Sequence, residues 1–408
     1  MTPLTPVNAA LKQVLASVQK PLGAENAPLA LAHGRTLAAD ILAQRTQPPF
    51  PASAMDGYAV RGADLVGSPS LRVIGMSAAG HGFAGTVGPG EAVRIFTGAP
   101  LPLGADSIVI QENTKAGDGL IAVAPGMPAA RHIRPAGTDF SQGDVLLRAG
   151  QRLDARRLAL AAAGGHAVLS VRRKPRIAIL ATGDELVPPG APTGPDQIVA
   201  SNSYAVAAFV EAAGGEVQDL GIARDDLPTL GTAIARATET ADVLVTLGGA
   251  SVGEHDLVQQ ALTTAGMALG FWRIAMRPGK PLMFGRLGHM IALGLPGNPV
   301  SSVVCTILFV APLLRALVGD PEAGSDISMA ATLARDVREN DEREDYLRAK
   351  LGPPGSDGLP TATALTRQDS SLLSVLGKAD ALIVRPPHAA ASKAGERCRV
   401  IRFTDVGR

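Results

Sequence analysis

Short apolar segments alternate with longer helix-forming segments between residues 174 and 319, and no other feature constrains the fold of this chain as strongly. The strand-like segments are 176–180 (RIAIL), 216–222 (EVQDLGI), 241–247 (ADVLVTL) and 290–295 (MIALGL). A helix-forming segment follows each of these strands. We therefore expect a doubly wound, mostly parallel α/β sheet with helices on both of its faces.

Capping residues support this pattern at the helix ends. Ser201 or Asn202 is suited to cap one helix, Gly214 to end it, and Asn298 to cap the last helix with Pro299 as its first residue. That last helix contains the most apolar run of the chain, which falls short of the ~20 residues that a membrane span needs. We expect a buried core helix there and no membrane contact.

The chain has 408 residues, which is too many for one hydrophobic core. Gly and Pro are frequent before the α/β segment, where short alternating strands also occur, and strand patterns return after it. We expect a multi-domain chain with four modules: a β-rich domain (46–146), an α/β domain (174–320), a C-terminal β-barrel-like domain (321–408) and a discontinuous helical linker domain (1–45 and 147–173). In the linker domain, the two helices that flank the β-rich domain in sequence would pack together.

Composition argues against several classes of partner. A net charge of +1 offers no basic surface for nucleic acid, and one Trp, three Tyr and nine Phe leave few platforms for base stacking. Cys305 and Cys398 lie far apart, outside any CxxC or Cys/His cluster. The first residues lack the basic and apolar regions of a signal peptide, so we expect a cytoplasmic protein.

Acidic residues follow several strands of the predicted sheet. In a doubly wound sheet, ligands bind beyond the carboxyl ends of the strands, near the point where the strand order reverses. The turns at this edge are TGDEL, RDD, GGASVGEHD and LPGNP, and they carry Asp184, Glu185, Asp225, Asp226, Glu254 and Asp256. Each carboxylate would also suit the first turn of a helix, where it caps the backbone and complements the helix dipole.

The glycine-rich turn after residue 247 adds a second signal. Gly248, Gly249 and Gly253 allow a phosphate to approach the backbone, with a helix N-terminus behind them. Mg²⁺ takes one or two protein carboxylates together with phosphate oxygens and water, so a magnesium-bound phosphate would suit this edge. The turn matches neither the GxGxxG nor the P-loop pattern. A tight structural turn would explain the glycines as well.

Other polar turns have ordinary structural interpretations. Arg277 and Lys280 flank a Pro-Gly pair, and together they would form either an anion clamp or a solvated hairpin tip. Asp56 precedes a glycine in an ordinary Asp-Gly turn, and Arg134 and Asp139 are suited to a loop ion pair of small energetic value.

Taken together and in order, these motifs resemble the molybdopterin molybdenumtransferase family, to which the C-terminal domain of gephyrin is related. The resemblance spans residues ~40 to 318 and rests on SAMDGYAV, FTGAPLPLGAD, RPAGTDF, ATGDEL, SNSYAVAAFVEAAGGEV, GGASVGEHD, RPGKPLMFG and LGLPGNPVSS. It implies an elongated four-domain homodimer, whose α/β domain is shared with the molybdopterin adenylyltransferases. It also implies a cofactor-biosynthesis reaction: molybdate is inserted into adenylylated molybdopterin, and AMP is released with Mg²⁺.

The resemblance also implies roles for individual residues. The catalytic positions are Asp56, Thr97, Glu185, Asp225 and Asp256. The Mg²⁺ positions are Asp184, Glu185, Glu254, Asp256 and Asp139. The substrate, phosphate or molybdate positions are Gly248, Gly249, Ser251, Gly253, Arg277, Lys280, Pro296, Asn298, Arg134, Arg348 and Ser370. Asp56 and Thr97 would face the α/β domain of the other subunit.

Three departures from the family pattern affect these assignments. Ala250 replaces a common Val, Arg277 replaces the usual Lys, and QDSSLLS stands where Gln-Gly-Ser is common near Ser370. Two alternatives to an enzyme that inserts molybdate remain open: a pterin-binding scaffold without catalysis, and an enzyme that inserts tungstate, which resembles molybdate in size and charge. An adenylyltransferase is disfavoured, since its members match the α/β segment alone, but transient contact with one is expected.

Overall fold

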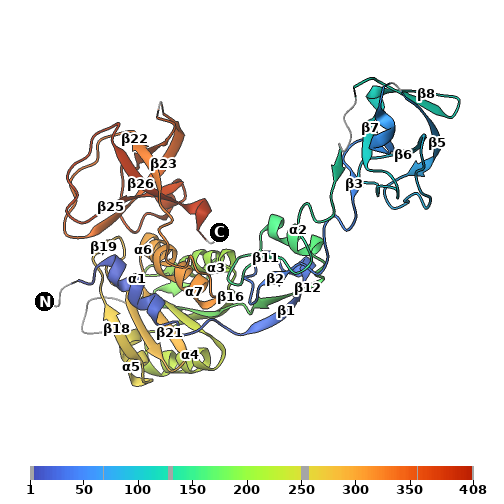
Figure 1. Ribbon diagram of the computed structural model, residues 1–408. Helices are drawn as coiled ribbons and strands as arrows, with labels where there is room; N and C mark the ends of the chain where they lie inside the picture. Colours follow the sequence, from blue (N-terminus) through green and yellow to red (C-terminus); the bar gives the residue numbers. More distant parts are fainter. Residues whose placement is uncertain (1–3, 68, 127–131, 250–256, 356, 407–408) are drawn as a thin grey trace.

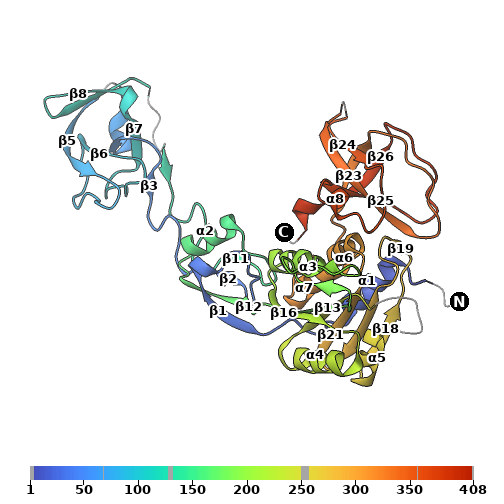
Figure 2. The ribbon, with the colours of Figure 1, turned by 180° about the vertical axis from the view of Figure 1, so that it is seen from behind.

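The structure is a computed structural model that describes residues 4–67, 69–126, 132–249, 257–355 and 357–406. The chain is elongated (Figure 1): a β-rich unit lies at one end, a narrow linker follows, and an α/β block with a C-terminal β unit lies at the other end. The view from behind (Figure 2) shows the same separation. The domain limits drawn from the sequence stay a prediction.

The α/β block contains a six-stranded sheet. Its strand order is β16 (Glu216–Ala223), β13 (Arg176–Thr182), β17 (Val243–Leu247), β21 (Met290–Leu295), β20 (Met283–Leu287) and β18 (Ala268–Trp272). The first four strands are parallel to one another, and β20 runs antiparallel to both of its neighbours, β21 and β18, which confirms the mostly parallel sheet. The chain moves outward from β13 to β16 and then returns to β17. The strand order therefore reverses between β13 and β17, where such sheets bind ligands.

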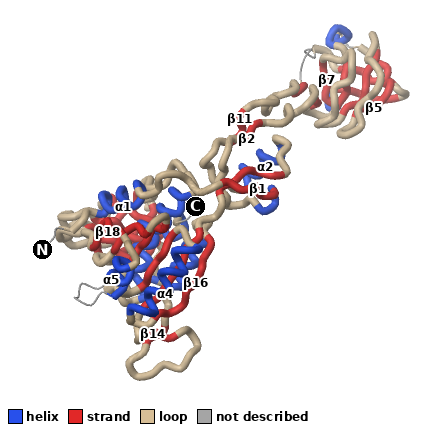
Figure 3. The backbone as a smooth tube through the Cα atoms, turned by 90° about the horizontal axis from the view of Figure 1, so that it is seen from below, coloured by secondary structure: helices blue, strands red, loops and turns tan. Residues whose placement is uncertain are grey.

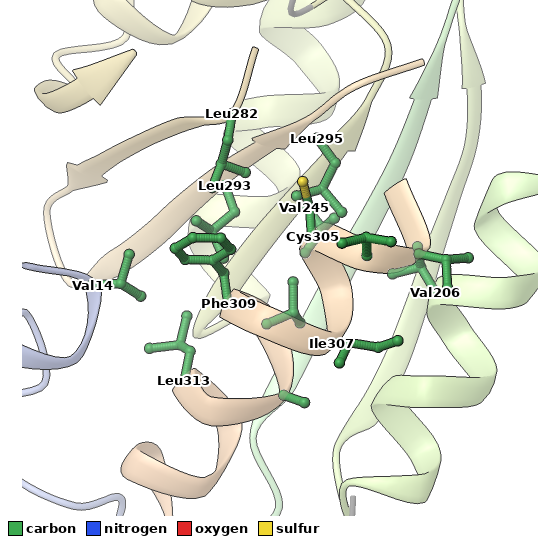
Figure 4. Close-up of a cluster of buried hydrophobic side chains, with 14 of the residues drawn as sticks. Val14, Val206, Val245, Leu282, Leu293, Leu295, Cys305, Ile307, Phe309 and Leu313 are labelled. Atoms are coloured by element: carbon green, nitrogen blue, oxygen red, sulfur yellow. The ribbon is translucent and has the colours of Figure 1, made fainter. Parts of the chain in front are cut away.

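Helices cover both faces of this sheet. One face carries α1 (Val7–Ala16), α3 (Asn202–Ala212), α6 (Pro299–Cys305), η4 (Thr306–Val310) and α7 (Ala311–Leu317). The other face carries α4 (Leu227–Thr240) and α5 (Leu257–Thr264). Figure 4 shows the first of these cores, in which Phe309 and Leu313 lie beside Val14 of α1.

The apolar stretch Pro299–Leu317 is long enough and apolar enough to span a membrane, but 78% of it is buried inside the protein. It is therefore a core helix, as predicted. Pro312 has no N–H group to donate within the helix, and the turn just before it, η4, widens to π geometry, which keeps the helix continuous.

The helix ends partly follow the predicted caps. Gly214 has a φ of 86° after α3, as a C′ glycine should, and Asp226 caps α4 by accepting the Thr229 N–H at 2.8 Å. Ser201 precedes α3 without a capping bond from its side chain. Asn298 precedes α6, but its side chain does not cap the helix. Its amide is used elsewhere, as described below.

The linker unit is built from short antiparallel pairs. In it, β1 (Ala24–Pro28) pairs with β12 (Val168–Arg172), and β2 (Ile41–Leu42) pairs with β11 (Val145–Leu147), beside η1 (Leu29–Leu31) and α2 (Ala155–Ala163). The expectation that the two flanking helices pack together is wrong. Helix α1 buries Val7, Ala10 and Val14, which share one helical face, against the α/β block, whereas α2 belongs to the linker core.

The β-rich unit contains a second six-stranded sheet. Its order is β7 (Ser107–Ile110), β4 (Gly57–Val60), β6 (Glu91–Ile95), β5 (Ser70–Ser77), β9 (Leu120–Val123) and β8 (Thr114–Gly117). The short pair β3 (Ala52–Ser53) and β10 (Ile133–Arg134) lies beside it, with η2 (Gly62–Leu65) and η3 (Gln111–Asn113) in the connections.

The C-terminal strands close into a barrel. Each strand pairs with the next in the order β23 (Glu344–Pro354), β24 (Pro360–Ala364), β22 (Met329–Leu333), β26 (Arg397–Arg402) and β25 (Ala381–Arg385), and β25 pairs again with β23. This confirms the predicted barrel-like domain, which also carries α8 (Leu373–Leu376) and η5 (Phe403–Asp405). Strand β19 (Met276–Arg277) of the α/β block pairs with β23 and ties the barrel to the block.

Candidate functional site

A cavity of about 580 Å³ opens at the carboxyl ends of β13, β17 and β21, beside the point where the strand order reverses. Its lining comes from four turns after the strands, from segment 198–203, from Pro281 and from one residue of the C-terminal unit: Gly183, Glu185, Asp225, Gly248, Gly249, Pro296, Asn298 and Ser371 are among these residues. The sheet therefore brings together residues that are more than 100 positions apart in sequence, as the predicted parallel order requires.

Three carboxyl groups gather at this edge. The Asp225 N–H donates to Asp184 Oδ1 at 3.3 Å, and Glu185 lines the cavity beside Asp225. Burial raises the pKa of the Asp225 carboxyl, and the carboxylates of Asp184 and Glu185 raise it further. The site therefore concentrates negative charge. Asp226, by contrast, serves as a helix cap: hydrogen bonds from Thr229 hold the pKa of its carboxyl low.

Mg²⁺ would fit this donor set only together with a substrate. Among the described residues, no three His, Cys, Asp or Glu side chains converge closely enough to hold a metal ion. Mg²⁺ normally takes just one or two protein carboxylates and completes its shell with phosphate oxygens and water, so Asp184 and Glu185 would suffice as donors. Two further predicted ligands, Glu254 and Asp256, lie outside the described residues, as do Ser251 and Gly253.

The glycines at this edge are needed by packing. Gly248 and Gly249 have φ values of 99° and 66°, and a Cβ atom on Gly249 would lie 2.2 Å from Val258 Cγ2. A Cβ atom on Gly183 would lie 2.3 Å from Glu185 Oε2. Gly183 thus makes room for the Glu185 carboxylate, a role that the sequence pattern did not reveal. The structural interpretation of the glycine turn holds, and it leaves the backbone of Gly248 and Gly249 in the cavity wall.

The turn after β21 joins the cavity to the C-terminal unit. Pro296 and Asn298 line the cavity, and Asn298 Nδ2 donates to Ser370 Oγ at 3.0 Å. The Val300 N–H donates to the Ser370 carbonyl at 3.1 Å. Ser370 is therefore held beside the lining residue Asn298, and its neighbour Ser371 is part of the lining.

Two of the lining residues that the sequence analysis missed hold loops of the site in place. Ser371 donates its N–H and its hydroxyl to Asp369 Oδ1 at 2.8 and 2.6 Å, which orients the loop toward the cavity. Asn202 donates from Nδ2 to the Gly297 carbonyl at 2.7 Å and so braces the turn after β21. The adjacent serines of QDSSLLS and the Asn of SNSYAV were the available signals.

Arg348 does not reach the cavity. Its side chain is 1% exposed inside the barrel, and its Nη2 donates to the Asp369 carbonyl at 3.0 Å. Burial lowers the pKa of Arg348, and Asp369 partly offsets this. In the single chain, Arg348 thus positions the loop that carries Ser370 and Ser371, and it is not part of the cavity lining.

Arg277 is occupied by carboxylates. Its Nε donates to Asp345 Oδ1 at 2.7 Å, its Nη2 donates to Asp345 Oδ2, and its Nη1 contacts Asp341 at 3.1 Å. The bidentate contact explains why Arg suits this position where Lys is usual, since a guanidinium spans both oxygens of one carboxylate. Lys280 is exposed and lines a different hollow of about 650 Å³, together with Arg273 and Glu344. Neither cation lines the main cavity, although Pro281, next to Lys280, does.

A second polar cluster lies in the β-rich unit. Asp56 Oδ1 accepts the Thr97 N–H at 2.7 Å and the Thr97 hydroxyl at 2.8 Å, and these hydrogen bonds lower the pKa of Asp56. Arg134 and Asp139 line a hollow that also includes Gly98, next to Thr97. The β-rich unit stands well away from the α/β block (Figure 1), so one chain does not bring this cluster to the cavity.

Family models match almost the whole chain. The MoeA N-terminal region (domains I and II) matches residues 5–165, a probable molybdopterin binding domain matches 178–316, and the MoeA C-terminal region (domain IV) matches 330–403. The molybdopterin molybdenumtransferase of Haemophilus influenzae is 35% identical over 98% of this chain and 99% of that protein. The corresponding protein of a Nostoc species is 37% identical over 78% of this chain and 75% of that protein.

Solved structures agree with the sequence relatives. A crystal structure of the molybdopterin biosynthesis protein MoeA from Pyrococcus horikoshii is 26% identical and superimposes with a TM-score of 0.85 over 98% of this chain and 100% of that chain. A second crystal structure of a MoeA protein, from Pyrococcus horikosii, is 32% identical with a TM-score of 0.82, and the match covers 98% of this chain and 99% of that chain. The chain therefore belongs to the molybdopterin molybdenumtransferase family.

Proposed function

We propose that this protein acts in molybdenum cofactor biosynthesis as a transferase that inserts molybdenum from molybdate into adenylylated molybdopterin and releases AMP. The names of the relatives support molybdopterin and molybdenum as the chemistry. The observation that carries the proposal is the cavity between β13 and β17, where carboxylates and backbone glycines occur together. The backbone of the glycines would bind a phosphate ester, and the carboxylates would bind a cation that is held on that phosphate.

The residues of the cavity divide into two roles. Gly248 and Gly249 offer their backbone to the phosphates, and Asp184 and Glu185 would hold Mg²⁺, which would neutralise the charge that develops on the leaving AMP. Asp225, whose pKa is raised by burial and by neighbouring carboxylates, is best suited to accept a proton from a water molecule whose oxygen bonds to the phosphorus of the pterin phosphate, as the P–O bond from that phosphorus to AMP breaks and AMP leaves. The 296–299 turn and Ser371 complete the lining.

AMP release from adenylylated molybdopterin tests this function. With Mg²⁺ and molybdate, wild type should release AMP, and Glu185→Gln should lower the rate about 100-fold or more while the substrate still binds. Glu211→Gln, on the exposed face of α3 in the same unit, is the matched control and should release AMP at the wild-type rate. Wild type that binds the substrate but releases no AMP with either molybdate or tungstate would leave a binding or scaffold protein.

We further propose that the active molecule is a homodimer in which the Asp56–Thr97 cluster of one subunit faces the cavity of the other. The separation of these two sets of polar residues within one chain supports this arrangement. Closed two-fold dimers are the commonest assembly of soluble proteins. Light scattering should give twice the 41.7 kDa of one chain, and a monomeric mass at catalytic concentrations would contradict the proposal. We also propose that the protein is cytoplasmic and makes transient contact with the adenylyltransferase that supplies the substrate.

A further inference from the structure

An apolar pair in the cavity wall has no role in the chemistry described so far. Strand β14 (Leu186–Val187) pairs in parallel with β15 (Ile198–Val199), and both residues of β15 line the cavity. Ile198 is 59% exposed and Val199 is 45% exposed. Single exposed apolar residues are common on proteins. Two adjacent ones in the wall of a cavity that also contains carboxylates are less easily explained, because each leaves apolar surface in contact with water where a ligand would bind.

The position of this pair relative to the acids is fixed by the backbone. The Ile198 N–H donates to the Glu185 carbonyl at 2.8 Å, and the Ala200 N–H donates to the Val187 carbonyl at 2.8 Å. The two strands lie at the base of the loop that connects residues 187 and 198 and projects from the α/β block (Figure 3). Ile198 and Val199 thus belong to the same wall as Glu185, next to the proposed site of the phosphates.

The remaining lining at this side suits the edge of a heterocycle. Ser201 and Ser203 follow β15 directly and line the cavity, and neither side chain has a hydrogen bond to another residue that the structure describes. Pro296 and Pro299 add further apolar lining. An apolar wall next to free hydroxyl groups matches a flat ring that is apolar on its faces and polar along its edge. Both the pterin and the adenine of adenylylated molybdopterin have this chemistry.

Resting on the proposed function, we propose that Ile198 and Val199 form the subsite for a flat heteroaromatic ring of the substrate, with Ser201 and Ser203 bonding its edge. The pair determines affinity and ring specificity, and the carboxylates act on the phosphates nearby. Because both side chains are about half exposed, their replacement by serine should leave folding stability nearly unchanged. A loss of binding can therefore be separated from a loss of structure.

The test is calorimetric binding of four probes to full-length wild type, Ile198→Ser and Val199→Ser. The probes are adenylylated molybdopterin, AMP, molybdopterin without AMP, and inorganic pyrophosphate, all with Mg²⁺. Loss of one apolar contact in a pocket weakens binding about tenfold or more. We expect such a loss for adenylylated molybdopterin and for one of the two ring ligands, with no change for pyrophosphate; the ring ligand that is affected identifies the ring.

Leu269→Ser is the matched control. Leu269 is 45% exposed, like Val199, and lies on β18 of the same sheet, outside the cavity lining. It should bind all four probes as wild type does. If Ile198→Ser and Val199→Ser keep wild-type affinity for both ring ligands, the subsite is refuted, and turnover by wild type would still leave the proposed function intact. If wild type itself fails to bind adenylylated molybdopterin, both the function and the subsite fail.

Discussion

Alanine at position 249 would place a Cβ atom 2.2 Å from Val258 Cγ2 and 3.0 Å from Val258 Cβ. Gly249 has a φ of 66°, in the left-handed region that favours glycine. Val258 is 1% exposed in α5, so its side chain cannot move into solvent to relieve the contact. The Gly249→Ala substitution therefore combines backbone strain with overpacking in one position of the cavity wall.

The two costs can be estimated separately. A residue with a Cβ atom pays about 1–2 kcal/mol in the left-handed region, and overpacking a dense core costs about 1–3 kcal/mol. We expect Gly249→Ala to lower the unfolding free energy by roughly 2–5 kcal/mol, the sum of both costs. Gly221→Ala is the control for strain alone, because Gly221 has a φ of 77° and an added Cβ would meet nothing within 4 Å.

The assay uses the single tryptophan of the chain. Trp272 lies at the end of β18 in the same sheet as the Gly249 turn, so its fluorescence during urea unfolding reports on the α/β block. Gly249→Ala should unfold at a clearly lower urea concentration than Gly221→Ala. Equal destabilisation of the two variants, within about 0.5 kcal/mol, would refute the close packing of the turn on α5.

A double variant isolates the clash. Val258→Ala removes Cγ2, the methyl group that would lie 2.2 Å from the new Cβ, and keeps the Val258 Cβ at 3.0 Å, so Gly249→Ala should cost less in that background by about 1–3 kcal/mol. The strain of the left-handed backbone should remain. Strictly additive effects of the two substitutions would contradict the contact that the structure places between them.

Three further substitutions test other parts of the account. Asp242→Asn removes a carboxylate that accepts two bonds from Arg173 at 2.8 and 2.6 Å, and should cost about 2 kcal/mol at neutral pH. Burial raises the pKa of Asp242, but these hydrogen bonds outweigh burial and lower the pKa overall. The stabilisation by Asp242 is therefore present above the unfolded pKa and is lost as pH falls through the lowered folded pKa. Urea unfolding at several pH values measures this loss. The pKa of Asp225 is raised by burial and by Asp184 and Glu185, so the contribution of this group to stability should fall as pH rises from the ordinary value of 3.8 through the folded value. The Tm of Asp225→Asn should therefore rise relative to that of wild type over this pH range, and the substitution should abolish AMP release. Thr246→Val replaces a buried hydroxyl that has no partner among the described residues, and should raise the unfolding free energy by about 1 kcal/mol, read from tryptophan fluorescence.

Local patterns predicted the α/β block well. The alternation of apolar strands with amphipathic helices determined the sheet class, and a parallel sheet necessarily brings the turns after β13, β16, β17 and β21 to one edge. Glu185, Asp225, Gly248 and Gly249 could therefore be placed together from sequence. The strands of the C-terminal unit were also predictable, because strand patterns return in the sequence after the α/β segment.

Long-range contacts were not predictable in the same way. The side chain of Arg277 bonds Asp345, which is 68 positions away, and nothing near either residue signals the pair. Arg348 resembled a binding residue, but strand alternation in a closed barrel turns it inward, where it bonds the Asp369 carbonyl. The docking of α1 on the α/β block likewise depends on an apolar face of α7 that is 300 positions away.

The composite nature of the proposed site is tested most directly by mixing two variants, Asp56→Ala and Glu185→Gln, each expected to be inactive alone. If the cavity of one subunit works with the Asp56–Thr97 cluster of the other, every mixed dimer contains one intact site. After unfolding and refolding of an equal mixture, molybdate-dependent AMP release should return to about one quarter of the wild-type rate. Mixed dimers that form but release no AMP would contradict a site shared between subunits.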